Sequence, residues 1–426
     1  MRATLICSLL LSGLTTAAHA DVLVVDGVGA LPGRHGAIQD AVLAASSGDT
    51  ILVDATIDAS GMHALIVGKG LSILSDTDDV QVDMAWLVAR DIPAGQSLTL
   101  RGLRAHGGNQ PALVFDNIGA ALRLFDVTAA GWLGWTQTTT AAGRDGGVGA
   151  VFTDCDDVIA TNSLFYGGVG GTLFGKDAIA ATSGGIGALV SDSRLTAFDT
   201  LILGGRGGKV TEPQSAGAGG HGGAALIADD SVLTFWELAP QGGDGGDTLF
   251  GPAGDGGTGL SQEGPSSITR LTYCDPIAGD AGVSSFAAQG VDGQALVQLG
   301  GSVVDIPGSK GYGRDLGLTT PVRVGEPISV TGIGFQDEYW LLYGFETGHQ
   351  LLPAHEGVLA VGAPLAGFVY VGYVPVLSKT FPLGPAPALP PGFDIATLQL
   401  QAVHVAPGGA FVLGEPEQLV VLDASF

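Results

Sequence analysis

The chain has 426 residues, of which 71 are glycine and 14% are charged, and its formal net charge is −25. A hydrophobic fraction of 46% excludes an intrinsically disordered chain, because disorder requires low hydrophobicity and dense charge. The acidic surplus argues against nucleic acid as a partner, and glycines without a period of three argue against collagen.

The first twenty residues have the features of a secretory signal peptide. Arg2 supplies the positive start, residues 5–14 form a short apolar core, and residues 18–20 (Ala-His-Ala) fit a cleavage site. The apolar run is too short to cross a bilayer and no later run is long enough, so we expect no membrane span. The sequence therefore predicts a secreted or cell-surface protein whose mature chain begins at Asp21.

Residues 37–53 combine an amphipathic run, a Gly-Asp turn and a β-rich run, Thr-Ile-Leu-Val. This segment resembles the opening of right-handed parallel β-helices of the pectin-lyase-like superfamily, and residues 69–74 and 98–104 resemble its next coils. The resemblance implies a capping helix near residues 37–46 and a parallel β-helix over residues 21–316. The superfamily includes lyases, hydrolases, adhesins and inert scaffolds, so its fold does not imply one activity.

Apolar triplets recur along the middle of the chain at intervals of roughly 36 residues, which is the signature of a repeat architecture. The triplets begin at Ala112, Ala150, Ala188, Ala225, Gly259 and Ala295. Each is followed by a polar turn, two further short apolar runs and a glycine-rich segment. Three strands per unit without a helical period predict stacked β-coils. We expect the glycine-rich segment to protrude at one corner, where positive φ and close backbone approach favour glycine.

The composition changes after about residue 316, where the glycine doublets stop and prolines cluster. Longer alternating runs appear at residues 339–345, 367–374 and 398–405. We therefore expect a separate all-β module of sandwich type over residues 317–426. It is similar to terminal modules on secreted bacterial proteins. We expect it to serve either in attachment or as a stabilising end cap.

Disulfides are not expected to hold this fold together. Cys7 leaves with the signal peptide, and Cys155 and Cys274 are predicted to lie several coils apart, which is too far for a bridge. We predict that both are buried free thiols.

In each repeat, one strand precedes the acidic turn. We assign this strand to the sheet that carries the catalytic side chains in enzymes of the superfamily. Its six copies are residues 112–115, 150–153, 188–191, 225–228, 259–262 and 295–298, and none of them contains an ionisable side chain. Acid–base catalysis needs a proton donor or acceptor, and glycoside hydrolysis normally needs two carboxyl groups. The pattern argues against an enzyme, unless the protruding loops carry the site.

Two columns of polar turn residues are expected to stack on successive coils. The first comprises Asp154, Asp192, Asp229 and Asp230, and the second comprises Asp126, Asn162, Asp199 and Glu237. A carboxylate ladder can bind calcium or raise a catalytic pKa. Because aspartate also suits turns for local reasons, we prefer a structural role for both columns.

The basic residues Arg101, Arg104, His106 and Arg123 are the one basic cluster of the sequence. An arginine is a candidate proton abstractor of a lyase, although surface arginines that pair with acids are more ordinary. Trp132 and Trp135 are candidates for a platform that binds sugar rings, with packing of a loop against the solenoid as the simpler alternative.

Residues 242–250 match a calcium-binding nonapeptide, in which Asp244 and Asp247 are the candidate ligands. The motif works in tandem, and the next nine residues depart from it, so a chance match in a glycine-rich chain is the alternative. No other cofactor is expected.

The sequence thus predicts a secreted, non-catalytic β-solenoid that acts as a surface, matrix or adhesion protein and contacts a polysaccharide. One alternative is a polysaccharide lyase or glycoside hydrolase, and another is a carbohydrate-binding protein without turnover. For the enzyme alternative, the candidate catalytic residues are Asp154, Asp192, Asp229, Arg101 and Arg104.

Overall fold

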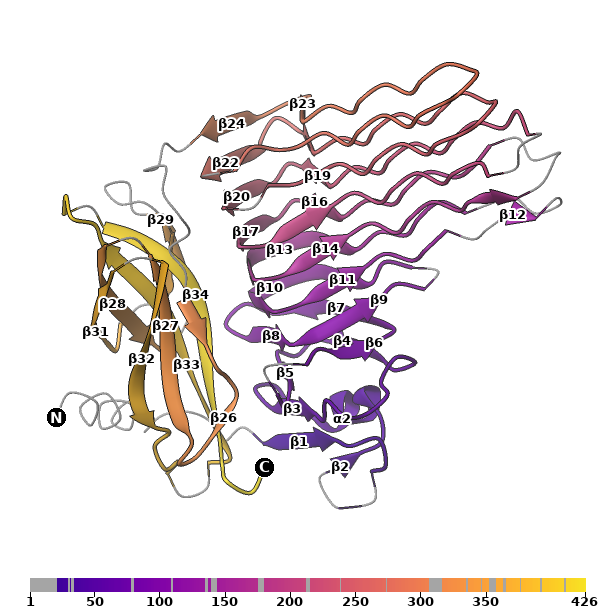
Figure 1. The fold of residues 1–426 in the computed structure, drawn as a ribbon. Helices are drawn as coiled ribbons and strands as arrows, with labels where there is room; N and C mark the ends of the chain where they lie inside the picture. The colour runs from indigo at the N-terminus through magenta and orange to yellow at the C-terminus, as the bar shows by residue number, and fades with distance from the viewer. Residues whose placement is uncertain are drawn as a thin grey trace.

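The computed structural model describes residues 21–29, 31, 34–77, 80–108, 110–134, 137–138, 144–174, 180–211, 215–237, 239–272, 274–305, 316–334, 336–345, 347–351, 358–362, 365–375, 377–390, 393–409 and 411–426. The predicted signal peptide, Cys7 and Trp135 lie outside these residues. In the described chain the regular structure is almost entirely β, with one helix (Figure 1).

The first part of the chain winds into a parallel β-helix, as predicted. Parallel pairing joins each coil to the next, so equivalent strands form three walls. The open wall comprises β4 (His63–Val67), β7 (Trp86–Ile92), the first halves of β10 (Leu113–Phe125) and β13 (Ala150–Thr161), β16 (Ala188–Ser191), β19 (Leu226–Asp229), β21 (Leu260–Glu263) and β23 (Leu296–Gln298).

The covered wall follows the open wall in each coil and packs against the C-terminal part of the chain. It comprises β3 (Thr50–Val53), β5 (Ser72–Ser75), β8 (Ser97–Arg101), the second halves of β10 and β13, β17 (Arg194–Phe198), β20 (Val232–Trp236), β22 (Ile268–Thr272) and β24 (Ser302–Asp305). The third wall comprises β6 (Val82–Met84), β9 (Leu103–His106), β11 (Thr128–Ala130), β14 (Leu164–Tyr166) and β18 (Leu201–Leu203).

The solenoid encloses one continuous apolar core, because alternate side chains of every strand point inward. The predicted triplets do lie on one wall, but their alignment is off by one residue at two of the five steps between successive triplets. The register pairs Leu113 with Ala150 and Ala188 with Leu226. The sequence alignment paired the alanines instead, because it matched residue type and ignored which side chain faces inward.

The N-terminal end of the solenoid is closed by helix α2 (Ile38–Ala44), which lies beside β1 (Val22–Val25), β2 (Arg34–His35) and β4 (Figure 1). Ile38, Ala41 and Val42 are buried in the core, whereas Leu43 is exposed. One apolar face of the helix therefore takes the place of a further coil.

The glycine-rich segments form a long extension from the corner between the third wall and the open wall (Figure 1). Each segment runs out and back, and its glycines donate backbone hydrogen bonds to the neighbouring arm. For example, Gly243 N–H donates to the Gly223 oxygen (2.9 Å), and Gly223 N–H donates to the Gly205 oxygen (2.8 Å). Short strands β12 (Gln137–Thr138) and β15 (Leu173–Phe174) also lie in this extension.

Close backbone approach, and not positive φ, explains the glycines of the extension. A Cβ on Gly243 would lie 2.5 Å from the Gly205 carbonyl carbon, and none of the described extension glycines has a positive φ. Contrary to the expectation from the sequence, the glycines of the extension do keep a period of three. Bonded glycines recur three apart, as in the pairs 205 and 208, 220 and 223, and 243 and 246. That period fits extended, three-residue-per-turn arms packed side by side.

The C-terminal part of the chain is a β-sandwich. One sheet comprises β25 (Leu316–Leu318), β27 (Pro327–Gly334) and β32 (Leu377–Pro385). The other comprises β26 (Val322–Arg323), β34 (Phe411–Leu422), β33 (Ile395–Val405), β28 (Asp337–Gly344) and β31 (Gly367–Val374). A hairpin of β29 (Thr347–Leu351) and β30 (Val358–Val361) adjoins them. Their shared apolar core is separate from that of the solenoid.

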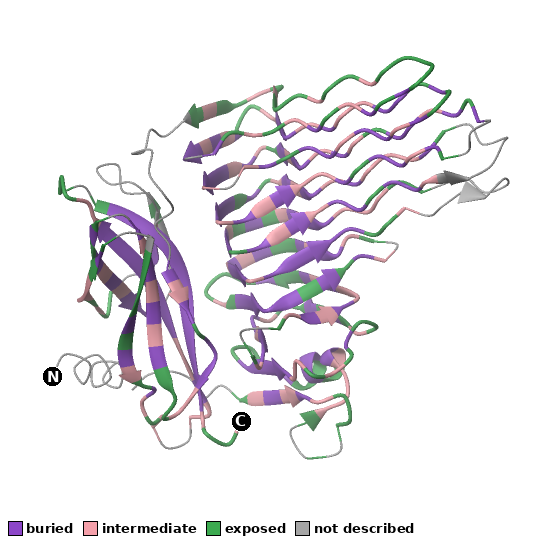
Figure 2. Ribbon diagram, viewed as in Figure 1, coloured by how far each residue is buried: buried purple, intermediate pink, exposed green. Residues whose placement is uncertain are grey.

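This sandwich lies along the side of the solenoid, so it is not a cap over the end of the coils (Figure 1). Two apolar clusters join it to the covered wall. One contains Leu52 and Leu74 with Val420, and the other contains Phe198 and Trp236 with Val412. Figure 2 shows that the strands along this contact are buried. The outward face of the covered wall is therefore internal to the molecule.

Candidate functional site: a polar seam between the solenoid and the sandwich

The open wall presents an aliphatic column to solvent. Its outward residues, aligned by register, are Leu65, Val88, Val114, Val151, Leu189, Ile227, Ser261 and Val297. The strands extend one residue beyond the segments used in the prediction, and the added positions include Asp116, Asp229 and Glu263. The open wall is thus aliphatic along one column, apart from Ser261, and carries ionisable side chains along its edge, where Asp229 lies beside Glu263.

Turn geometry accounts for the first polar column. Asp154, Asp192 and Asp230 all adopt positive φ, the left-handed conformation that aspartate and asparagine tolerate best. Asp229 does not belong to this column, because it pairs with Ser191 on the preceding strand. Asp154 and Asp192 are exposed, and neither lines the crevices between the solenoid and the sandwich.

The second column is also a ladder of left-handed turns. Asp126, Asn162, Asp199 and Glu237 have φ between 39° and 78°. Asn162 Nδ2 donates to Asp126 Oδ1 at 2.5 Å, which links successive coils. Unlike the first column, this one faces the sandwich, so it contributes to a crevice.

The predicted basic cluster divides between two walls. Arg104 and His106 lie on the third wall, where both are exposed and sit 3.6 Å and 3.3 Å from Asp83. Arg101 and Arg123 lie on the covered wall and are buried. The division arises because the chain turns a corner between Arg101, at the end of β8, and Arg104 on β9.

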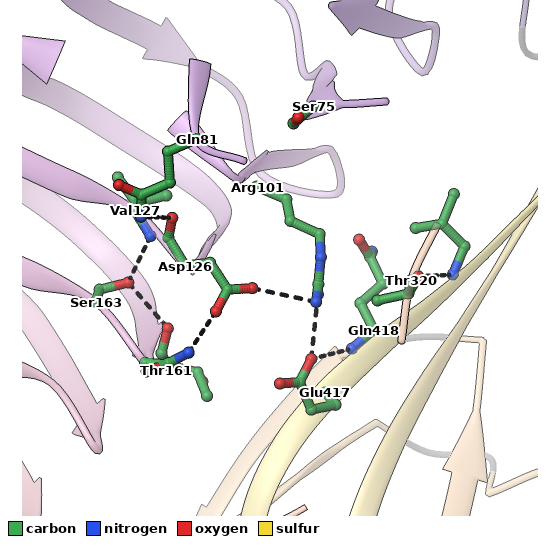
Figure 3. A network of polar contacts seen from close by, with 12 residues as sticks. Ser75, Gln81, Arg101, Asp126, Val127, Thr161, Ser163, Thr320, Glu417 and Gln418 are labelled. Carbon is green, nitrogen blue, oxygen red and sulfur yellow. Dashed lines mark hydrogen bonds and ion pairs between the residues drawn. The ribbon is translucent and has the colours of Figure 1, made fainter. Parts of the chain in front are cut away.

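Arg101 connects the two parts of the molecule. Its guanidinium lies 3.1 Å from Asp126 Oδ2 on the solenoid and 3.1 Å from Glu417 Oε2 on the sandwich, as Figure 3 shows. The arginine side chain is 4% exposed and that of Glu417 is 9% exposed. Removal of one partner from such a buried pair is strongly destabilising, because it leaves an uncompensated charge.

Arg123 forms a second buried ion pair, within the covered wall. Its Nη2 lies 2.5 Å from Asp157 Oδ2, and its Nη1 donates to the carbonyl oxygens of Leu122 and Asp157. Burial lowers the pKa of the Arg123 guanidinium, and the Asp157 carboxylate partly offsets that effect. The Nε atom is buried without a hydrogen-bond partner in the described chain.

A crevice of about 630 Å³ lies between Arg123 and the sandwich. Phe345 is its aromatic residue, and Arg123 is the one charged residue among those that line it. The other polar side chains are hydroxyls and carboxamides: Ser47, Ser72, Gln96, Ser97, Thr99, Thr397, Gln399 and Gln418. The Gln418 Oε1 atom is buried without a hydrogen-bond partner in the described residues. We call this space the amide–hydroxyl crevice.

A second crevice of about 320 Å³ gathers carboxylates around Arg101. Its acidic lining residues are Asp126, Asp199, Glu415 and Glu417. Burial raises the pKa of the Asp199 carboxyl, because the charged form loses hydration there. We call this space the carboxylate crevice.

Trp132, Asp244 and Asp247 lie on the extension, away from the crevices between the solenoid and the sandwich. Trp132 is exposed, whereas Trp135 is outside the described residues. Asp244 Oδ1 accepts from Asp280 N–H, and Asp247 lies 2.7 Å from Lys209 Nζ. No group of three metal-ligating side chains occurs within the described ranges. Calcium binding by Asp244 and Asp247 stays a prediction, which melting with and without a chelator tests.

Cys155 and Cys274 are buried free thiols, as predicted. Cys155 occupies a position equivalent to Ser193 and Ser231 in a ladder of turn hydroxyls, and its N–H donates to Ser193 Oγ at 2.9 Å. Burial raises the pKa of Cys155 to about 12.

The comparisons with known proteins identify no family. No protein-family model and no curated protein matches this sequence. A solved structure of full-length tailspike protein 2 from Escherichia coli O157:H7 bacteriophage CAB120 aligns with 86% of this chain and 59% of that chain, at 10% identity. Its TM-score of 0.20 is too low to establish a shared fold.

No helix in the described part of the chain is long and apolar enough to span a membrane.

Proposed function

We propose that this protein is a secreted, non-catalytic β-solenoid of the pectin-lyase-like kind that attaches to a polysaccharide. The amide–hydroxyl crevice carries the proposal. Hydroxyl and carboxamide groups from both parts of the chain converge on a space of ligand size, with Phe345 beside them. These groups match the hydroxyls of a neutral sugar, and an aromatic face covers sugar C–H surface.

The charge of this crevice supports the proposal of binding without turnover. Its one ionised group is Arg123, which Asp157 already pairs. An arginine that is buried and held in an ion pair in this way is poorly placed to donate a proton to a substrate or accept one from it. The aliphatic column of the open wall likewise contains no carboxylate, and the acids Asp229 and Glu263 lie at the edge of that wall.

Retention on immobilised neutral and acidic polysaccharides tests the proposal. Gln399→Leu keeps the side-chain size and removes the carboxamide, so we expect retention to fall at least tenfold. Gln350→Leu, at an exposed position on β29, is the matched control and should retain binding. If both variants bind as the unaltered protein does while Trp132→Ala abolishes binding, the site lies on the extension and the crevice is not the binding site.

A glycoside hydrolase is the second candidate, and the carboxylate crevice favours it. Asp199, with its raised pKa, has the character of a general acid beside other carboxylates. Reducing ends and the ultraviolet absorbance of unsaturated products should be followed on the same polysaccharides. Turnover that Asp199→Asn abolishes would replace binding with hydrolysis as the function.

A further inference from the structure

The last coil of the solenoid leaves one end of the molecule open. Strand β23 pairs with β21, and β24 pairs with β22, and no described strand pairs with the opposite edge of either. Figure 1 shows this coil at the end opposite α2. Solenoids normally need a terminal cap with a polar outer face, because a coil cannot bury its own upper surface.

The apolar core reaches solvent at this end. Leu296 continues the inward column of Leu226 and Leu260, which are both 0% exposed, yet Leu296 is 37% exposed. Leu299, at the following turn, is 70% exposed. These exposures arise because no coil of the described chain lies above them.

The extension of the same coil is apolar as well. Phe286 stacks on Phe250 of the preceding coil, with ring centroids 5.0 Å apart, and is 73% exposed. Figure 2 shows exposed residues along both the strands and the extension of this coil. The large apolar side chains exposed on it are Ile277, Val283, Phe286, Val291, Leu296, Leu299 and Val304.

The size and character of this surface fit a protein interface. The seven side chains expose on the order of 700 Å² in total, close to the area that each partner buries in a standard interface. Strands β23 and β24 contain neither lysine nor proline, two residues that protect an exposed strand edge from pairing, and their one charged residue is Asp305 at the end of β24.

We propose that a second copy of this chain covers the open end, so that two solenoids join end to end about a two-fold axis. Head-to-tail stacking is excluded because α2 closes the other end. A two-fold axis parallel to the glycine-rich extension places the open end of one apolar core over the open end of the other. It also places Phe286 of one copy against Phe286 of the second copy. Such isologous contacts are the commonest way in which a chain self-associates. The inference is independent of what the protein binds.

Sedimentation velocity of the purified full chain tests the proposal. We expect a monomer–dimer equilibrium that Phe286→Asp and Leu299→Asp each weaken at least tenfold. Phe368→Asp is the matched control, because Phe368 is 66% exposed and contacts one ring, that of Trp340. Circular dichroism confirms that each variant is folded.

The arrangement of the dimer is tested by spin labels. A label on Ser285→Cys should give a short intermolecular distance, and a label on Ser60→Cys, near the capped end, should give none in that range. A protein that is monomeric at every concentration overturns the proposal. A dimer that Phe368→Asp weakens and Phe286→Asp leaves intact overturns it too.

Discussion

Gly243→Ala tests whether backbone contact holds the extension together. The new Cβ would clash with the carbonyl oxygen of Gly205 and lie 2.5 Å from its carbon and 2.8 Å from the Gly204 oxygen. These atoms belong to backbone fixed by the bonds from Gly243 to Gly223 and from Gly223 to Gly205. The substitution therefore cannot be relieved by a side-chain rotation.

The magnitude follows from the movement required. An ordinary Cβ contact is 3.4–4 Å, so the two arms must separate by about 1 Å and lose at least two hydrogen bonds. At roughly 1 kcal/mol for each bond and about 1–3 kcal/mol for overpacking, the cost is about 3–5 kcal/mol. For a domain of this size, that corresponds to roughly 5–10 °C in melting temperature.

Thermal and urea unfolding followed by circular dichroism measure the effect. The midpoints are compared directly, because a chain with two cores need not unfold in one step. Gly61→Ala is the control, since nothing lies within 4 Å of a Cβ there. If Gly243→Ala and Gly61→Ala unfold at the same midpoint, the arms are loosely packed and close backbone approach does not explain the glycines.

Three further predictions concern titratable groups. Because burial raises the pKa of Asp199, its ionisation costs more in the folded state, and Asp199→Asn should raise the melting temperature at pH 7. This gain should shrink as pH falls through the raised pKa and vanish below 3.8, the ordinary pKa of an aspartate; a gain that persists at lower pH would contradict the assignment. Cys155, with its pKa raised to about 12, should resist a thiol reagent at pH 8 until urea unfolds the chain; rapid reaction in native buffer would show that it is accessible. Arg101→Met should lower the melting temperature at pH 7, because the ion pairs of Arg101 with Asp126 and Glu417 are lost; an unchanged melting temperature would show that these pairs do not stabilise the fold.

Local chemistry determined the solenoid. The sequence repeats alternating apolar runs, polar turns and glycine-rich segments at a regular interval. This repetition specifies stacked coils, because residues of the same type then lie next to one another on successive coils. The turn ladders at Asp126 and Asp154 followed from the same reasoning, since a left-handed turn favours aspartate wherever it recurs. The buried thiols followed as well.

Tertiary structure alone decided which wall is buried and where the polar groups converge. Gln399 and Gln418 sit in alternating strands that could have faced water, and nothing local indicates that they face Arg123 across a crevice. The pairing of Arg101 with Glu417 joins residues 316 positions apart, a contact that no repeat encodes. Both crevices form only where the sandwich packs against the covered wall. The sequence specifies each of these two surfaces separately, so it does not indicate that they meet.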